Sequence, residues 1–125
     1  MLSVRKKVLL VDDDEAVIEY LTIKLADEFE LIATSSPEQA LHLAREIAPD
    51  LVICDIDLQT GMDGGDISAA LYAQPETKHI PLIYLTALVS PADLKASNNQ
   101  LAGRAAISKQ ASIGQIVAKI RANIG

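Results

Sequence analysis

Five polar side chains in this sequence stand where short apolar runs end, and their chemical types are complementary. Three are carboxylates, one is a hydroxyl and one is an ammonium: Asp12, Asp13, Asp55, Thr86 and Lys109. Oxygen ligands, with no His or Cys beside them in the sequence, favour Mg²⁺ or Mn²⁺ over Zn²⁺. Neighbouring carboxylates repel by about 4 kcal/mol per pair at an effective dielectric constant near 20. Either one acid therefore takes up a proton at a raised pKa, or a divalent cation lies among them.

The apolar runs predict buried strands, and the segments between them carry helical patterns. Continuous runs rich in Leu, Val and Ile are typical of parallel strands covered on both faces. We expect strands over 8–11, 30–34, 51–55, 81–86 and 105–108, and helices over 16–27, 36–48, 66–73, 90–101 and 112–123. This alternation predicts an α/β fold, a doubly wound parallel sheet with helices on both faces.

Several helix starts are marked by capping residues. Ser36-Pro37-Glu38-Gln39 combines an N-cap, a proline in the first turn and a glutamine that can reach back. Ser112 and Gln115 repeat the Ser-x-x-Gln spacing, and Ser90 precedes another proline. We expect two capping boxes and a capped fourth helix.

The topology brings the five polar residues to one edge of the sheet. The carboxyl ends of parallel strands share an edge, where ligands of open α/β sheets bind. A carboxylate beside a hard cation, with a lysine and a hydroxyl across the site, suits an incoming phosphoryl group. The cation and Lys109 can take up charge on its oxygens while an Asp oxygen attacks in line. The sequence therefore predicts a phosphoryl-accepting site.

Composition narrows the class of protein. The chain has 125 residues and a net charge of −6, with scattered basic residues, so we expect one domain over 1–125 with no output domain and no direct nucleic-acid binding. No segment approaches the roughly twenty apolar residues of a membrane span. We expect a cytoplasmic protein without a membrane contact. The lone Cys54 excludes an internal disulfide and is expected to be a small buried hydrophobe.

At this point the sequence resembles the receiver domains of two-component response regulators. Val-Asp-Asp, Pro-Asp-Leu-Val-x-x-Asp, Leu-Thr-Ala and a late Lys occur in order at fitting separations along essentially the whole chain. The resemblance implies a flavodoxin-like, CheY-like sheet in the order 2-1-3-4-5. It also implies a phosphoprotein that serves as an aspartyl-phosphate switch rather than a turnover enzyme.

The resemblance also implies a role for each site residue. Asp55 is the expected phosphoacceptor, with a histidine kinase or phosphotransfer protein as donor and an unknown effector or output domain downstream. Asp12 and Asp13 are expected to hold Mg²⁺ together with Asp55, and Asp57 to offer its backbone carbonyl. Thr86 and Lys109 are expected to bind phosphoryl oxygens.

The sequence departs from the family pattern in three places. Gln110 stands where a proline usually follows the lysine, so we expect a trans peptide bond and a displaced loop. Ala106 occupies the switch position that commonly carries an aromatic residue, so we expect a different or weaker response of the output face. Gln59-Thr60-Gly61 suggests a longer loop after Asp55, and Leu88 suggests slow loss of the phosphoryl group.

One alternative interpretation remains open, and two others fit the sequence poorly. A degenerate receiver could act as a phosphorylation-independent interaction module. Asp55-Ile56-Asp57 resembles the acid pair of haloacid-dehalogenase-like phosphatases, but Gln59 stands where Thr or Val is expected. A calcium loop from Asp55 to Asp66 lacks the required glycine, since Thr60 occupies that position.

Overall fold

The computed structural model describes residues 5–56, 64–87, 90–97, 100–101 and 104–124. The central sheet contains five parallel strands in the order β2-β1-β3-β4-β6, and a short strand, β5, is added antiparallel at the β6 edge. The strands are β1 (Lys7–Val11), β2 (Glu30–Thr34), β3 (Leu51–Asp55), β4 (Leu82–Thr86), β5 (Gln100–Leu101) and β6 (Arg104–Ser108). The prediction of a doubly wound parallel sheet is confirmed, with β6 as the fifth parallel strand.

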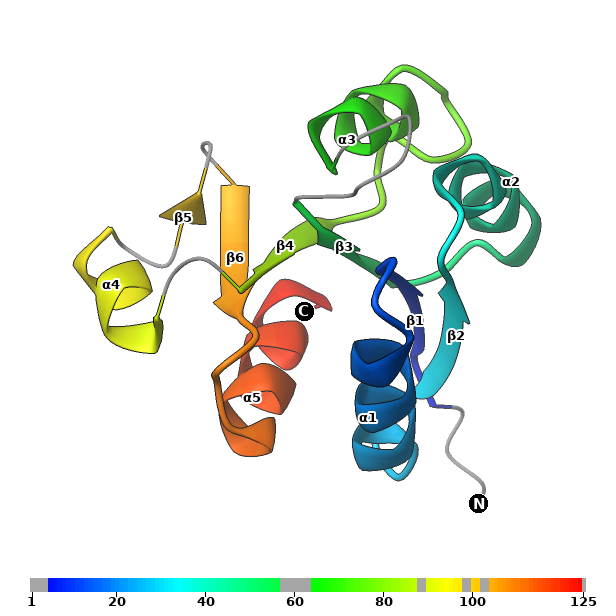
Figure 1. Ribbon diagram of the computed structural model, residues 1–125. Helices are drawn as coiled ribbons and strands as arrows, with labels where there is room; N and C mark the ends of the chain where they lie inside the picture. Colours follow the sequence, from blue (N-terminus) through cyan, green and yellow to red (C-terminus); the bar gives the residue numbers. More distant parts are fainter. Residues whose placement is uncertain (1–4, 57–63, 88–89, 98–99, 102–103, 125) are drawn as a thin grey trace.

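Five helices connect these strands and cover the sheet (Figure 1). They are α1 (Glu15–Leu25), α2 (Pro37–Ile47), α3 (Gly64–Tyr72), α4 (Pro91–Ala96) and α5 (Ile113–Ile124). α1 and α5 lie on one side of the sheet, and α2 and α3 lie on the other. The sheet is therefore the middle of three layers.

Each of the five parallel strands sends alternate side chains into two separate cores. In β1, Val8 and Leu10 join Leu21 of α1 and Ile120 of α5 in one core. Leu9 and Val11 face the other core, which holds apolar residues of α2, α3 and α4. Because both faces are buried, β1 and β3 are apolar along almost their whole length.

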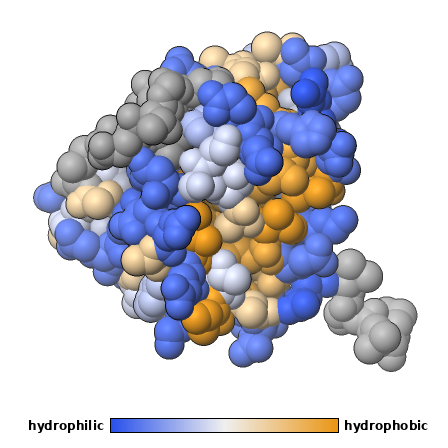
Figure 2. All heavy atoms as spheres, turned by 45° about the vertical axis from the view of Figure 1, so that its right-hand side comes forward, coloured by the Kyte–Doolittle hydropathy of each residue, from blue (hydrophilic) through white to orange (hydrophobic). Residues whose placement is uncertain are grey.

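The two edges of the sheet are built differently. Among the described strands β2 pairs only with β1, and its residues Leu31, Ile32 and Ala33 are half-buried. Figure 2, which brings this side of the molecule forward, shows apolar surface among hydrophilic side chains. At the other edge, β5 pairs with only Arg104 and Ala105 of β6. Neither β2 nor β5 contributes a residue of the predicted acceptor site.

The fourth helix is shorter than predicted. It ends at Ala96 rather than near Leu101, and Ser97 is its C-cap. The Ser97 hydroxyl donates to the backbone carbonyl of Leu94 and lies 3.0 Å from that of Gln100, which starts β5. Asparagines 98 and 99 are poor helix formers, and residues 100–101 gain strand pairing instead. Tertiary pairing with β6 thus overrides the helical pattern.

The capping boxes are confirmed in one case and only half formed in the other. At α5, the Ser112 amide donates to the Gln115 side chain and the Gln115 amide donates to the Ser112 hydroxyl, at 2.9 and 3.1 Å. At α2, the Gln39 amide donates to Ser36, but the Ser36 amide donates to the Thr34 hydroxyl at 3.1 Å. The expectation that Gln39 reaches back to Ser36 was wrong, because Thr34 already occupies that donor.

Replacing Ser112 with alanine is expected to lower the free energy of unfolding by about 1 kcal/mol, because the Gln115 amide at the start of α5 loses the hydroxyl to which it donates. Urea denaturation followed by circular dichroism measures the change. Ser35→Ala is the matched control, since this exposed serine caps no helix, and its effect should stay within about 0.5 kcal/mol. Equal stability of the two variants would contradict the capping role.

Candidate functional site

The strand register brings the predicted site residues to one edge of the sheet. Val11 of β1 pairs with Cys54 of β3, so Asp12 and Asp55 leave adjacent strands side by side. Thr86 ends β4 and pairs with Ser108 of β6. The Lys109 amide continues this pairing by donating to the Thr86 carbonyl at 2.7 Å. Backbone pairing therefore brings four of the five residues to the same edge of the sheet: Asp12, Asp55, Thr86 and Lys109.

The Lys109 ammonium joins two of the carboxylates. Its Nζ lies 2.9 Å from Oδ2 of Asp12 and 3.1 Å from Oδ2 of Asp55. The side chains of Asp12 and Asp55 are 0% and 7% exposed, and that of Lys109 is 17% exposed. One cation thus bridges two buried acids that come from different strands.

Asp12 is the most buried of the acids and organises the start of α1. Its Oδ1 accepts a hydrogen bond from the Asp14 amide at 2.8 Å. Asp14 in turn is the N-cap of α1 and accepts from the Ala16 amide at 2.9 Å. Oδ2 of Asp12 is fully buried and, beyond the contact with the Lys109 ammonium, has no hydrogen-bond partner in the described part of the chain. That atom is oriented into the site.

Asp13 completes the acidic cluster. It is half-buried, and one carboxylate oxygen from each of Asp12, Asp13 and Asp55 lies within 4.8 Å of the others. Acids this close in a buried setting favour either a bound proton or a bound cation. The clustering predicted from the strand ends is confirmed for these three residues.

Burial and nearby charged or hydrogen-bonding groups shift the pKa values of Asp12 and Lys109. Burial raises the pKa of the Asp12 carboxyl, the nearby Asp55 charge adds to the rise, and hydrogen bonds from Lys109 and Asp14 oppose it. For Lys109, burial alone works to lower the pKa, but hydrogen bonds to Asp12 and Asp55 outweigh it and the pKa is raised. The ammonium is therefore charged at neutral pH.

The other predicted site residues are placed as follows. Thr86 is buried, at 1% exposure, at the end of β4 on the same edge as the acids. Ala106 is buried in β6 and pairs with Tyr84 of β4. The Lys109–Gln110 peptide bond is trans, as predicted. The predictions for Asp57, for the loop 59–61 and for Leu88 lie outside the described residues.

Two supporting residues were missed by sequence reasoning. Asp14 was treated only as part of an acidic turn, although an Asp directly before a helical pattern is a recognised N-cap signal. Ser108 is buried at the end of β6, and its hydroxyl accepts a hydrogen bond from the Gln110 amide at 3.1 Å. That bond holds the turn after Lys109 without a proline, and no sequence pattern pointed to it.

The geometry is that of an acidic pocket with a lysine across it, at the carboxyl edge of a 2-1-3-4-5 type sheet. A family model described as "Response regulator receiver domain" matches residues 8–121. The chain belongs to this family. The resemblance drawn from the motifs is thereby confirmed over nearly the entire sequence.

Curated relatives agree with this assignment. The chain is 38% identical over 93 residues to the DNA-binding response regulator MtrA of Mycolicibacterium smegmatis, which covers 74% of this chain and 39% of MtrA. It is 36% identical over 83 residues to the response regulator PleD of Caulobacter vibrioides, covering 66% of this chain and 18% of PleD. The matches thus span well under half of these relatives, and only their receiver portions are comparable.

Solved structures share the fold. A protein from Chloroflexus aurantiacus, assigned as a response regulator, superposes with a TM-score of 0.80 at 27% identity and covers 96% of this chain and 98% of its own. The chemotaxis protein CheY4 of Vibrio cholerae superposes with a TM-score of 0.78 at 23% identity, covering 94% of this chain and 98% of its own. This protein is a receiver domain with a CheY-like fold. Among the described residues, no helix has the length and apolar character needed to cross a bilayer.

Neutralising Asp12 is expected to stabilise the metal-free fold in a pH-dependent way. Because the pKa of Asp12 is raised above its ordinary value of 3.8, the folded state binds more protons than the unfolded state between the two pKa values. The contribution of Asp12 to stability therefore falls as pH rises through that window and stays lower above it. Asp12→Asn has no carboxyl group to ionise at this position, so it does not lose stability as the pH rises through that window.

In urea denaturation with a chelator present, Asp12→Asn should be more stable than the wild type at pH 7, because the pKa of Asp12 is raised and its charge in the buried cluster lowers the stability of the wild-type fold. The difference should shrink as the pH falls toward 3.8. Asp27→Asn, at an exposed turn, is the matched control and should show no such trend. A less stable Asp12→Asn at pH 7 would mean that the ion pair with Lys109 outweighs burial and repulsion.

Proposed function

We propose that Asp55 accepts a phosphoryl group in a Mg²⁺-dependent reaction and that the modified domain switches its partners. The observation that carries the proposal is the bridge of Lys109 Nζ to both Asp55 and Asp12, at 3.1 and 2.9 Å, with Asp13 in the same cluster. This arrangement puts a cation beside the oxygen that would be modified. It also leaves the acids with more negative charge than one ammonium offsets.

The residues present fit a divalent cation. The donor set consists of carboxylate oxygens within 4.8 Å of one another, and Oδ2 of Asp12 is buried with the Lys109 ammonium as its described partner. Such hard oxygen donors suit Mg²⁺, with Mn²⁺ as a substitute. Asp12, Asp13 and Asp55 would hold it, with the carbonyl of Asp57 as the further ligand that the family resemblance implies. The ion would supply positive charge to the phosphoryl oxygens.

The chain's own residues then have separate tasks. An Asp55 oxygen attacks the phosphorus of a phosphohistidine in line, the new O–P bond forms as the N–P bond breaks, and the imidazole nitrogen leaves with that electron pair. Lys109 transfers its contact from the Asp55 carboxylate to a phosphoryl oxygen. The hydroxyl of Thr86 binds another phosphoryl oxygen.

The donor that fits this step is a histidine kinase or a histidine phosphotransfer protein. The receiver belongs to the two-component class, and its described residues include no output domain element. The effector that reads the phosphorylated state is therefore a separate protein or a separate part of a longer chain. The DNA binding named for MtrA is a property of that protein.

A second candidate function is a phosphorylation-independent interaction module. The observation that favours it is Ala106, a buried residue of β6 at 3% exposure, which has no aromatic ring to reorient when Thr86 moves. The intact cluster of three acids and Lys109 supports the phosphoacceptor instead. The two functions differ in whether the domain takes up a phosphoryl group at all.

Incubation with Mg²⁺ and acetyl phosphate should add one phosphoryl group to the wild-type protein, measured as intact mass. Asp55→Asn should give no adduct, because the amide is not a nucleophile toward phosphorus. A chelator should abolish the adduct in the wild type. Asp27→Asn, which changes an exposed acid away from the site, is the control and should be modified like the wild type.

An adduct that persists in Asp55→Asn would place the acceptor elsewhere. No adduct in a folded wild type, with either acetyl phosphate or a phosphorylated histidine donor, would favour the interaction module.

Asp13→Asn is expected to weaken Mg²⁺ binding by at least about tenfold, since one of three carboxylate donors loses its charge. Titration of MgCl₂ into apo protein, followed by amide chemical shifts, measures the affinity. The half-buried position of Asp13 lets the variant fold, and Asp14→Asn serves as the matched neighbour because asparagine also caps helices. Equal affinities for the two variants would remove Asp13 from the ligand set.

Binding of a beryllofluoride mimic is expected to perturb the amides around Asp55, Thr86 and Lys109 strongly and those of α4 and the start of β6 weakly. The reason is that Ala106 carries no ring to transmit the movement of Thr86. Amide spectra with and without the mimic measure both regions. Large shifts throughout α4 would show that another residue transmits the change.

A further inference from the structure

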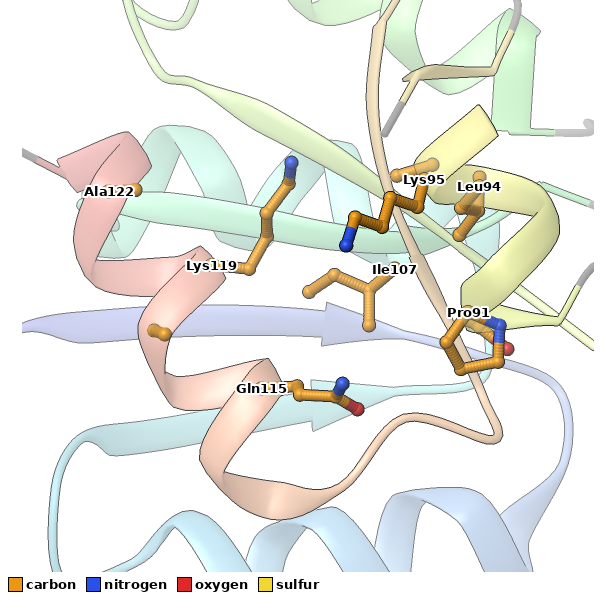
Figure 3. A pocket seen from close by; sticks show the side chains of 10 residues that line it. Pro91, Leu94, Lys95, Ile107, Gln115, Lys119 and Ala122 are labelled. Carbon is orange, nitrogen blue, oxygen red and sulfur yellow. The ribbon is translucent and has the colours of Figure 1, made fainter. Parts of the chain in front are cut away.

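The two edges of the central sheet differ in how their backbone groups are covered. β5 pairs with Arg104 and Ala105 at the β6 edge. The rest of β6 borders a groove of about 410 Å³ between α4 and α5, where Lys95 and Lys119 lie on either side of Ile107 (Figure 3). A short added strand and charged side chains both discourage pairing with a further strand. β2 has no strand on its outer side in the described part of the chain.

The parallel pairing with β1 decides which backbone groups of β2 point outward. The Glu30 amide donates to the carbonyl just before β1 at 2.9 Å, and the Thr34 carbonyl accepts from the amide just after β1 at 3.2 Å. Along a parallel strand, alternate residues direct their amide and carbonyl groups to opposite sides. Glu30, Ile32 and Thr34 therefore bond to β1. The amides and carbonyls of Leu31 and Ala33 point away from it, and no described strand pairs with them there.

The side chains of this edge are apolar on both faces of the sheet. Leu31 and Ala33 are half-buried against the core beneath α1 and α5, and Ile32 is half-buried against the core on the other face. Figure 2 shows the apolar surface on this side of the molecule. The edge thus combines outward backbone donors and acceptors with apolar surface, which is the combination that an added strand covers.

We propose that β2 pairs with β2 of a second copy of this chain, antiparallel and with the two-fold axis at Ile32. In this register Leu31 of each copy lies opposite Ala33 of the other. The outward amide of each residue donates to the outward carbonyl of the residue opposite, so both form hydrogen-bonded pairs. The two copies then share one continuous sheet, and the interface is the same patch on both, as a two-fold axis requires.

The sequence of β2 is self-complementary about this axis. The large Leu31 faces the small Ala33 on one side of the sheet, and the two Ile32 side chains meet on the other. Glu30 lies opposite Thr34 rather than opposite another acid. Antiparallel pairing also keeps the two Glu30 carboxylates at opposite ends, roughly 14 Å apart along the strands. Parallel pairing in register would place them side by side, where like charges destabilise.

Neighbouring registers fit less well. An axis at Leu31 would pair Ala33 with Phe29, whose amide already donates to the last residue of α1 at 2.9 Å. An axis at Ala33 would pair Leu31 with Ser35, which lies beyond the end of β2, where the chain turns into α2. The axis at Ile32 uses both outward residues of the strand and none outside it.

The dimer is expected to be weak and to depend on protein concentration. Pairing of one five-residue strand covers less area than the roughly 1,200–2,000 Å² of stable interfaces. Sedimentation from about 10 µM to about 1 mM, without Mg²⁺ or a phosphoryl donor, should show a monomer converting to a dimer. Added salt should strengthen the dimer, because two copies of net charge −6 repel each other.

Amide hydrogen exchange tests which backbone groups pair. At the highest concentration the amides of Leu31 and Ala33 should exchange at least about tenfold more slowly than in the dilute protein. The amides of Ile32 and Thr34 bond to β1 and should be protected at every concentration. This alternation is expected only where a strand is added to the outer side of β2.

Cross-linking tests the register. Ile32→Cys places two thiols on the axis, where opposite Cβ atoms lie about 4.5–5.5 Å apart, so a small adjustment permits a disulfide. Oxidised glutathione should convert most of this variant to a covalent dimer. Glu30→Cys is the matched control, because its thiols would lie roughly 14 Å apart along the strands and should stay unlinked. The buried Cys54 is common to both variants.

A proline tests the need for the outward amide. Ala33→Pro removes the donor that points away from β1 and leaves the bonds to β1 in place, so the variant should fold and remain monomeric. Ala33→Ser keeps the amide and nearly the same size and should dimerise like the wild type. Circular dichroism checks that both variants are folded.

Four results would overturn the proposal. A wild type that stays monomeric at about 1 mM, with fast exchange at Leu31 and Ala33, would leave the edge unpaired. Equal disulfide yields from Ile32→Cys and Glu30→Cys would exclude this register. A dimer that persists in Ala33→Pro would use another surface. Protection of the two amides in a monomer by acetyl-Thr-Val-Thr-Val-Thr-amide would assign the edge to a strand of another protein.

The measurements are independent of the proposed acceptor chemistry. They use the unmodified protein, and β2 contributes no residue to the acidic cluster. A monomeric protein that takes up a phosphoryl group at Asp55, or a dimer that takes up none, would separate the two proposals.

Discussion

Three carboxylates at one edge of the sheet repel one another, and much of the local structure serves to hold them there. The Lys109 ammonium offsets two of them directly, at 2.9 and 3.1 Å. The Asp14 amide offsets part of the charge on Asp12. What remains is an excess of negative charge in a buried place, with the pKa of Asp12 raised as a consequence. Keeping such a cluster buried lowers the stability of the fold, and the proposed cation and phosphoryl group would interact with this excess charge.

The backbone fixes this cluster more firmly than any side chain does. Parallel pairing of β1 with β3, and of β4 with β6, brings Asp12, Asp55, Thr86 and Lys109 to one edge from positions nearly a hundred residues apart. The bond from the Lys109 amide to Thr86 extends the pairing past the end of β6. A change in register by one residue would turn each acid toward the opposite face. The two apolar cores set that register, so core packing and site geometry are linked.

Ala106 and Gln110 depart from the family pattern, whereas the clustered acids and Lys109 keep the arrangement described above. Ser108 holds the turn after Lys109 through its bond to the Gln110 amide, where a proline is absent. Ala106 leaves room between α4 and α5, and two lysines line that room. Both departures therefore leave the proposed acceptor chemistry in place.

The sequence by itself determined the alternation of strands and helices, the positions of the acids at strand ends, and the family. These features are local: apolar runs, capping serines and residue order can all be read along the chain. The short β5 and the early end of α4 could not be read in this way, because pairing of residues 100–101 with β6 outweighs a weak helical pattern. The bridging role of Lys109 depends on distances across the sheet. So does the groove between α4 and α5, because its walls are far apart in the sequence and meet only when α5 packs beside β6.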